Sequence, residues 1–304
     1  MINFNDAERL CQSRFDLLGK CWHLWTPDNF KLIFPDDGSF MKGMGIIAIC
    51  AALFPDIAIL TFELMTNHLH ITVAGEEARI REMFSLIKKT LSRTIQIDLT
   101  DWDCKLRRIM DLQDARNVIT YNNRNGFLVN DDESPFSYRW GANSFYFNRE
   151  AKARYYESGT SLPFNERRRL MASHKADSVT WLRKTDGYVS PLSFCAIEKG
   201  ESLFRNASHY FYEISRNIES QKAIAKEIGE RIFYTDNELF TVVIKKVRDN
   251  YGDIKPSLLP IQAKLEIAKQ LHYEYNAGNK QIQRMLSMDI KTVEELFPSG
   301  RNAR

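Results

Sequence analysis

Two histidines at alternate positions of one short segment are the residues of this chain best suited to chemistry. The segment 67–73, with the sequence NHLHITV, closes a long apolar run that begins at Ile57. If residues 68–73 form a strand, His68 and His70 share one face, because side chains alternate along a strand. Two imidazoles held in this way could bind one divalent cation. The alternative is a pair of half-buried histidines at the end of a sheet.

A tyrosine about fifty residues downstream supplies a candidate nucleophile. Residues 111–124 are expected to form a helix that Asp111 opens and Asn125-Gly126 ends. Tyr121 and Asn125 are four positions apart and therefore share a face of that helix. A phenol has an ordinary pKa of about 10 and attacks poorly unless its target is polarised. A cation held by two histidines and one amide oxygen would polarise a phosphodiester, and a tyrosine nucleophile would conserve the bond energy as a phosphotyrosine. The alternative is a tyrosine packed at a helix end.

The elements that must position these groups follow from the hydrophobic pattern. In chain order we expect a helix at 5–18, a strand at 21–25, a helix at 39–54, a β-hairpin of strands 57–65 and 68–73, and a helix at 76–96. One face of the last helix is basic, which suits a phosphate backbone, although such faces are also simply solvated. The candidates for phosphate contacts in this half of the chain are Arg79, Lys88, Lys89, Arg93 and Arg124.

The second half of the chain is predicted to be helical. We place a first domain at 1–150, a charge-rich helix or linker at 149–169, and an all-α domain within 151–304. Its candidate helices are 175–184, 191–199, 207–229, 236–250, 261–276, 278–287 and 290–297. The last three fit a helix-turn-helix at 261–297, or else an ordinary three-helix bundle. In the first case the DNA-contacting side chains would be Lys280, Gln281, Arg284 and Lys291.

Composition limits the class of protein. A chain of 304 residues with 44% hydrophobic and 27% charged residues is expected to fold rather than to be disordered. A net charge of +3 permits a polyanionic partner without requiring one. The five cysteines are scattered and never in a CxxC pair, which argues against a disulfide framework or a cysteine zinc site. The N-terminal residues carry charges where a signal peptide needs its apolar core, and the longest apolar stretch, Gly43–Phe54, is too short to span a bilayer. We therefore expect a cytoplasmic protein with no membrane partner.

These motifs together resemble a known family. The segment 66–71 (TNHLHI) is similar to the PNHVHL-type motif of the single-tyrosine HUH transposases, especially the REP-associated tyrosine transposases. In that family a later helix carries Tyr-x-x-x-Asn-Pro or Tyr-x-x-x-Gln, and this chain has YNNRNG at 121–126. The segment 135–138 (PFSY) resembles a Trp-Pro-Phe-Ser stretch that often follows. The resemblance covers residues 20–147, about half of the chain.

The resemblance implies an α+β fold, with a ferredoxin-like antiparallel sheet and packed helices in the first domain. It also implies a metal-dependent nickase or strand transferase, a monomer or a homodimer, that acts on single-stranded or hairpin DNA. Tyr121 would attack and leave a 5′-phosphotyrosine and a free 3′-hydroxyl. His68, His70 and Asn125 would hold Mg²⁺ or Mn²⁺.

The chain also departs from the family pattern. Gly126 stands where proline is usual, and Thr66 stands where proline is common. A second register would place Asn117 at the nucleophile position, but the register on Tyr121 keeps both the nucleophile and the amide. The C-terminal half has no counterpart in minimal members and is expected to be an added DNA-reading module. Two other functions stay open: a catalytically silent DNA-binding protein or regulator, and a metal-dependent hydrolase without a covalent intermediate.

Overall fold

The chain divides into two compact units. The computed structural model describes residues 4–28, 30–125, 138–171, 174–216, 218–229 and 234–298. The first unit extends to Asn217 and the second begins at Ile218, whereas the patterns of the sequence placed a boundary near residue 150. The first unit combines sheets and helices, and the described residues of the second are helical. The expected α+β class is therefore confirmed.

A four-stranded antiparallel sheet forms the centre of the first unit. Its strands are β1 (Cys21–Trp25), β2 (Ala58–Leu64), β3 (Leu69–Ala74) and β4 (Lys105–Ile109). They lie in the order β2-β3-β1-β4, so that β1 and β3 are central. The strands expected at 21–25, 57–65 and 68–73 are confirmed to within one residue, with His68 just before the start of β3. The sequence patterns did not predict β4.

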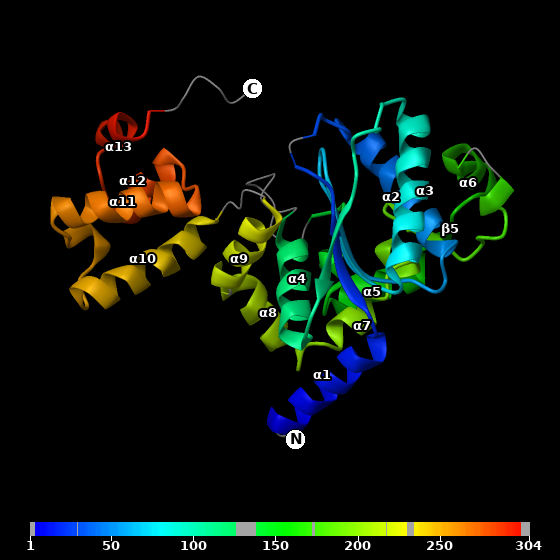
Figure 1. Ribbon diagram of the computed structural model, residues 1–304, viewed down its shortest axis with the longest axis horizontal. Helices are drawn as coiled ribbons and strands as arrows, with labels where there is room; N and C mark the ends of the chain where they lie inside the picture. The colour runs from blue at the N-terminus through cyan, green and yellow to red at the C-terminus, as the bar shows by residue number, and fades with distance from the viewer. Residues whose placement is uncertain are drawn as a thin grey trace. The chain divides into compact units, whose positions relative to one another are not determined.

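Helices cover the two faces of this sheet differently. The helices α2 (Asp37–Ala52) and α3 (Glu77–Ile95) pack together on one face, and α4 (Leu112–Asn125) lies on the other (Figure 1). Gly43 lets α2 approach β2 closely, because a Cβ there would lie only 2.8 Å from Cδ2 of Leu64. Leu69 and Ile71 of β3 are fully buried and share this apolar side of the sheet. The alternation along β3 therefore turns His70 to the side of α4.

The rest of the first unit corrects the prediction of an all-α second half. It contains α1 (Phe4–Leu18), α5 (Arg149–Ser158), α6 (Phe164–Met171), α7 (Ile197–Glu201), α8 (Ala207–Arg216) and the small sheet β5 (Thr160–Ser161), β6 (Arg183–Thr185) and β7 (Tyr188–Val189). The helix predicted at 175–184 is wrong, since that segment leads into β6. The reason is a two-residue hairpin turn at Asp186-Gly187, where both residues have positive φ, 54° and 88°.

The second unit agrees more closely with the prediction. Its helices are α9 (Ile218–Ile228), α10 (Asp236–Tyr251), α11 (Ile261–Tyr275), α12 (Asn279–Leu286) and α13 (Ile290–Leu296). The helices expected at 236–250, 261–276, 278–287 and 290–297 are thus confirmed. The described residues of the range expected at 207–229 are helical up to Ile228, as α8 in the first unit and α9 in the second, and Asn217 between them lies outside the described residues. None of the helices that the structure describes is both long and apolar enough to cross a membrane.

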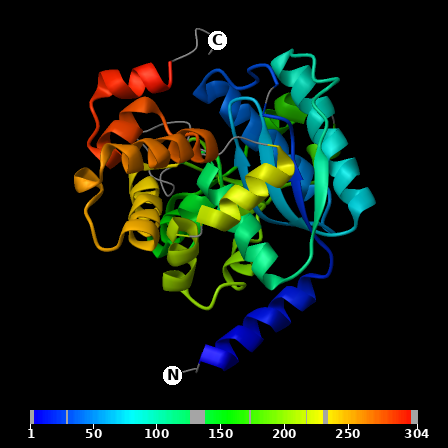
Figure 2. The same cartoon turned by 60° about the vertical axis from the view of Figure 1, so that its left-hand side comes forward.

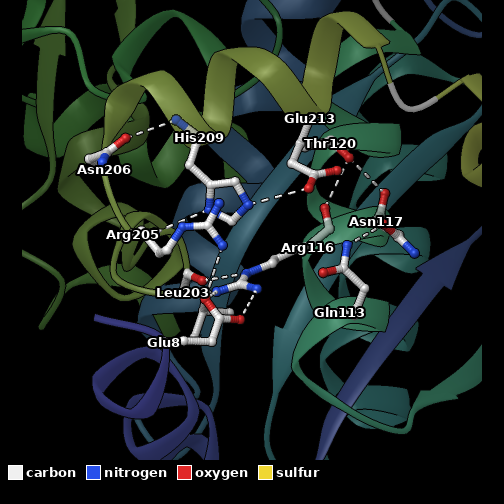
Figure 3. Close-up of polar contacts among 10 residues, drawn as sticks. All are labelled: Glu8, Gln113, Arg116, Asn117, Thr120, Leu203, Arg205, Asn206, His209 and Glu213. Carbon is white, nitrogen blue, oxygen red and sulfur yellow. Dashed lines mark hydrogen bonds and ion pairs between the residues drawn. The ribbon is translucent and has the colours of Figure 1, made fainter. Parts of the chain in front are cut away.

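A buried arginine fixes α4 to α1 and to the segment between α7 and α8 (Figure 3). The side chain of Arg116 is 2% exposed and makes paired hydrogen bonds to the carboxylate of Glu8 on α1, at 2.5 and 3.1 Å. Its Nε donates to the carbonyl oxygen of Leu203, at 2.7 Å, just before α8. Arg205 donates to the same carboxylate at 3.2 Å. Glu8 therefore connects α1, whose N-terminal half extends beyond the sheet in Figure 2, to the base of α4.

We predict that Glu8→Gln lowers the free energy of unfolding by about 1–2 kcal/mol at neutral pH, because the buried guanidinium loses its counter-charge while an amide oxygen still accepts one bond. The hydrogen bond from Arg116 holds the pKa of Glu8 below its ordinary value. Glu8 therefore adds stability above its unfolded pKa of about 4.3 and loses it as the pH falls through the lower folded pKa.

Denaturant unfolding of both proteins between pH 3 and 8 measures the effect. The difference should be constant from pH 6 to 8 and shrink below about pH 4. Glu157→Gln, at an exposed position of α5, is the control and should change little. A difference that grows with falling pH would contradict the assignment.

Candidate functional site

The face of the sheet that α4 covers is polar and buried. In the antiparallel register, His70 of β3 lies opposite Glu63 of β2, and Thr72 lies between Thr61 and His23 on the two neighbouring strands. Residues directly opposite one another in an antiparallel pair point to the same side. All five side chains have an exposed fraction of 0%. Burying a polar sheet face costs free energy unless its side chains find hydrogen-bonding partners, and it is otherwise expected only where a function requires it.

Side chains of α4 bond to this face. Asn122 donates from Nδ2 to the hydroxyl of Thr72 at 2.8 Å, and the hydroxyl of Thr61 donates to the amide oxygen of Asn123. Asn123 donates in turn to the phenol of Tyr210 at 2.8 Å. Burial raises the pKa of Tyr210 well above its ordinary value, so this phenol stays protonated. The amides of α4 thereby fix the height and rotation of the helix above β2 and β3.

The predicted nucleophile lies against the predicted metal ligand. Tyr121 is 2% exposed, and its ring meets the ring of His70 edge-on, with centroids 5.8 Å apart and planes at 80°. The ring of His23, at 6.1 Å and 72°, approaches Tyr121 in the same way. The structure thus brings together Tyr121 and His70, which the sequence predicted, and adds His23, which it did not. A prediction from the sequence that β1 pairs with β3 would have placed His23 in this group.

Asn67 determines the tautomer of His68. Its Nδ2 donates to the carbonyl oxygens of Asp28 and Phe30, so its amide oxygen must be the atom that faces His68. That oxygen lies 2.8 Å from Nδ1 of His68 and can only accept a hydrogen bond. Nδ1 of His68 therefore carries a proton, and Nε2 carries the lone pair. The half-buried ring of His68 is held in the tautomer that binds a metal through Nε2.

His70 is also held through Nδ1. Nε2 of His23 lies 3.3 Å from Nδ1 of His70, and the two rings stack with centroids 5.5 Å apart and planes at 24°. The rings of His68 and His70 are 5.1 Å apart and nearly perpendicular, at 85°. Both histidines thus make a contact within the protein through Nδ1, and for His70 the proton can lie on either side of that contact.

The two expected imidazole ligands lie side by side, and the third expected ligand lies outside what the structure describes. Asn125 is the last residue of α4, and its side chain is not among the described atoms. Among the described residues, no group of three or more His, Cys, Asp or Glu side chains is placed to hold a metal ion. The expected ligand set contains two histidines and one amide, so it is not a group of three such side chains.

The basic residues of α3 lie on the opposite face of the sheet (Figure 1). Arg79 pairs with Asp56 at 2.8 Å and also with Glu82, and Lys88 lies 2.5 Å from a carboxylate oxygen of Asp103. Arg93 donates to the carbonyl oxygen of Met171. Lys89 is exposed and forms no ion pair with another described residue. The structure therefore does not place the predicted α3 cations beside the histidines.

Other cations do lie at the edge of the histidine face. The register of β4 against β1 places Lys105 opposite Trp25, and Arg107 opposite His23. Arg107 pairs with Asp114 of α4 at 2.8 Å, and Lys105 is exposed. Arg124, predicted to contact phosphate, is instead 1% exposed within the first unit. The sequence feature that could have located Lys105 is the short segment 105–109 (KLRRI), which forms β4.

The predicted DNA-contacting residues of the second unit fall into two groups. Arg284 forms two hydrogen bonds with the carboxylate of Asp236, at 2.7 and 3.0 Å, and Gln281 donates to the same carboxylate and to the carbonyl oxygen of Tyr234. These bonds attach α12 to the start of α10. Lys280 and Lys291 are both exposed, and neither forms an ion pair with another described residue.

We predict that Thr72→Val lowers the free energy of unfolding by about 1–3 kcal/mol, because it leaves the buried amide of Asn122 without its acceptor. Thr120→Val is the matched control, since its buried hydroxyl donates only to carbonyls of its own helix. Adding Asn122→Leu to Thr72→Val should recover part of the loss. Equal losses in the two threonine variants would contradict the role of this bond, as measured by urea unfolding.

A comparison of the chain with models of protein families, with curated proteins and with solved structures found no match in any of the three. The functional argument therefore starts from the residues and their geometry. Its basis is a buried polar sheet face on which His68 and His70 are held through Nδ1, with Tyr121 of α4 against the ring of His70.

Proposed function

We propose that this protein cuts and rejoins single-stranded DNA with Tyr121 as the nucleophile, in a reaction that depends on Mg²⁺ or Mn²⁺. The observation that carries the proposal is the edge-on approach of Tyr121 to His70, at 5.8 Å, across a buried polar sheet face. His68, His70 and Asn125 are the proposed metal ligands. The proposed substrate is a single strand or a hairpin.

The topology supports this proposal. The order β1-α2-β2-β3-α3-β4 with strands arranged β2-β3-β1-β4 is what a ferredoxin-like domain requires. Both histidines come from the segment at the start of a central strand, and the tyrosine comes from the helix that follows the fourth strand. The order of hairpin, helix and tyrosine helix agrees with the order that the resemblance to single-tyrosine HUH transposases implies.

Each group has a distinct role in the proposed reaction. The phenol of Tyr121 gives up its proton, its oxygen attacks the phosphorus to form a bond, and the bond from phosphorus to the 3′-oxygen breaks. The departing 3′-oxygen takes up a proton, and the 5′-phosphate stays on Tyr121. A divalent ion at the histidines would withdraw charge from the non-bridging oxygens and orient the phosphorus. Attack of a 3′-hydroxyl on the phosphotyrosine reverses the step and rejoins a strand.

Burial favours a second candidate function. His70 is fully buried and Tyr121 is 2% exposed. A DNA strand can therefore reach them only if the parts of the protein that cover them move aside. A DNA-binding protein that keeps the histidine face without cutting would tolerate this burial. The two functions differ in one result, a covalent bond between protein and DNA.

We predict that the wild-type protein forms a DNA adduct that survives denaturation when it is incubated with a labelled single strand and Mn²⁺. Tyr121→Phe should abolish the adduct and leave DNA affinity within about twofold, because only the nucleophilic oxygen is lost. Tyr156→Phe, at an exposed position of α5, is the control and should keep the adduct. An adduct that persists in Tyr121→Phe, or that forms fully in EDTA, would contradict the proposal.

A second prediction concerns DNA binding by the second unit. If Lys280 and Lys291 contact phosphates, Lys280→Gln and Lys291→Gln should each reduce the slope of log affinity against log salt by roughly one unit. Lys226→Gln, on the exposed part of α9, is the control. Arg284 is unsuitable for this test, because its loss also breaks the pair with Asp236. An unchanged slope in both lysine variants would show that these residues do not bind the backbone.

A further inference from the structure

His23 lies at the centre of the candidate site, although no part of the proposed reaction has yet used it. It lies on β1, opposite Thr72, and its side chain is fully buried. Its ring stacks on the ring of His70, lies 5.1 Å from that of Trp25, and faces the edge of Tyr121. Its Nε2 lies 3.3 Å from Nδ1 of His70. A histidine so close to a proposed ligand must affect how that ligand binds.

The contact between the two rings has two forms, and they differ in chemistry. One nitrogen must donate and the other must accept. If Nδ1 of His70 donates, then Nε2 of His70 carries a lone pair and can bind a metal ion. If Nε2 of His23 donates instead, a neutral His70 carries its proton on Nε2 and offers no lone pair there. The position of one proton between His23 and His70 therefore decides whether His70 can be a ligand.

We propose that His23 is a positioning residue that accepts the Nδ1 proton of His70 and so holds His70 ready to bind a divalent cation through Nε2. The neighbouring ligand supplies the parallel. The amide oxygen of Asn67 can only accept, and it fixes His68 in the same tautomer at 2.8 Å. His23 does for His70 what Asn67 does for His68, from a strand that is distant in sequence. This inference rests on the proposed metal site, but its central claim concerns a proton in the protein without metal.

Ring contacts restrict the rotation of His23. Its plane is inclined by only 24° to that of His70, and the ring of Trp25 lies 5.1 Å away at 34°. A ring in contact with two neighbouring rings has little freedom to turn its nitrogens away. His23 is thus suited to fix the rotation of the His70 ring as well as its tautomer, and both set the direction of the Nε2 lone pair.

The test is to determine the tautomer of His70 by NMR of the imidazole nitrogens in the full-length protein without metal, at one fixed pH. Wild type should show the proton on Nδ1 of His70. His23→Gln places an amide oxygen near Nδ1 of His70, where it can accept the proton, and should keep that tautomer. His23→Phe keeps a ring but no acceptor and should shift His70 toward the Nε2 proton. Trp22→Phe, on the opposite face of β1, is the control and should leave His70 unchanged.

Several outcomes would overturn the assignment. One is a wild-type His70 with its proton on Nε2, and another is a His70 that keeps its Nδ1 proton in His23→Phe. If His23→Phe does not fold, the wild type alone still decides the question, because it must show the Nδ1 proton.

Binding of Mn²⁺ alone gives a second readout. Loss of a partner that orients a metal-binding histidine typically weakens metal affinity by about 10–100-fold. His23→Phe should show a loss of this size, and His23→Gln should recover most of it. Equal affinity in wild type and His23→Phe would contradict the role toward the metal. If wild type shows the Nδ1 tautomer but Mn²⁺ yields no DNA adduct, the proposed function fails while the proton assignment stands.

Discussion

The alternation of side chains along β3 is the constraint on which the rest of the first unit depends. Leu69, Ile71 and Val73 are directed to the side of α2 and α3, and all three are completely buried. His70 and Thr72 are directed to the side of α4 and are buried equally. A shift of one residue in the register would exchange these two sets. The apolar side thus determines where the polar side lies, and the hydrophobic core holds the histidines in place.

The polar side needs a partner of matching chemistry, and α4 provides it. The amides of Asn122 and Asn123 bond to threonine hydroxyls of β3 and β2, which offsets part of the cost of burying them. Tyr121, beside these amides on the helix, then meets the ring of His70. Arg116 anchors the start of the same helix to Glu8 of α1. The position of the proposed nucleophile is therefore set at two places along one helix.

Local patterns in the sequence predicted the elements whose own residues define them. The histidine hairpin, α3, the helix with Tyr121 and the helices from 236 onward follow from periodicity and end signals. The role of His23 could not be predicted in this way, because it depends on the pairing of β1 with β3 across about fifty residues. The basic face of α3 was visible, but Asp56 and Asp103, which neutralise part of it, lie outside the helix. The turn at Asp186-Gly187 was a local signal that the helical interpretation overlooked.

The central claim is that the phenol of Tyr121 forms a bond to DNA phosphate, and mass spectrometry tests it most directly. Trypsin should release residues 117–124 as one peptide, NVITYNNR, which contains a single tyrosine. After reaction with a short single strand and Mn²⁺, followed by nuclease digestion, this account predicts a nucleotide phosphate attached to Tyr121. A nucleotide phosphate attached to any other residue, or an unmodified peptide under conditions in which the strand is cut, would contradict it.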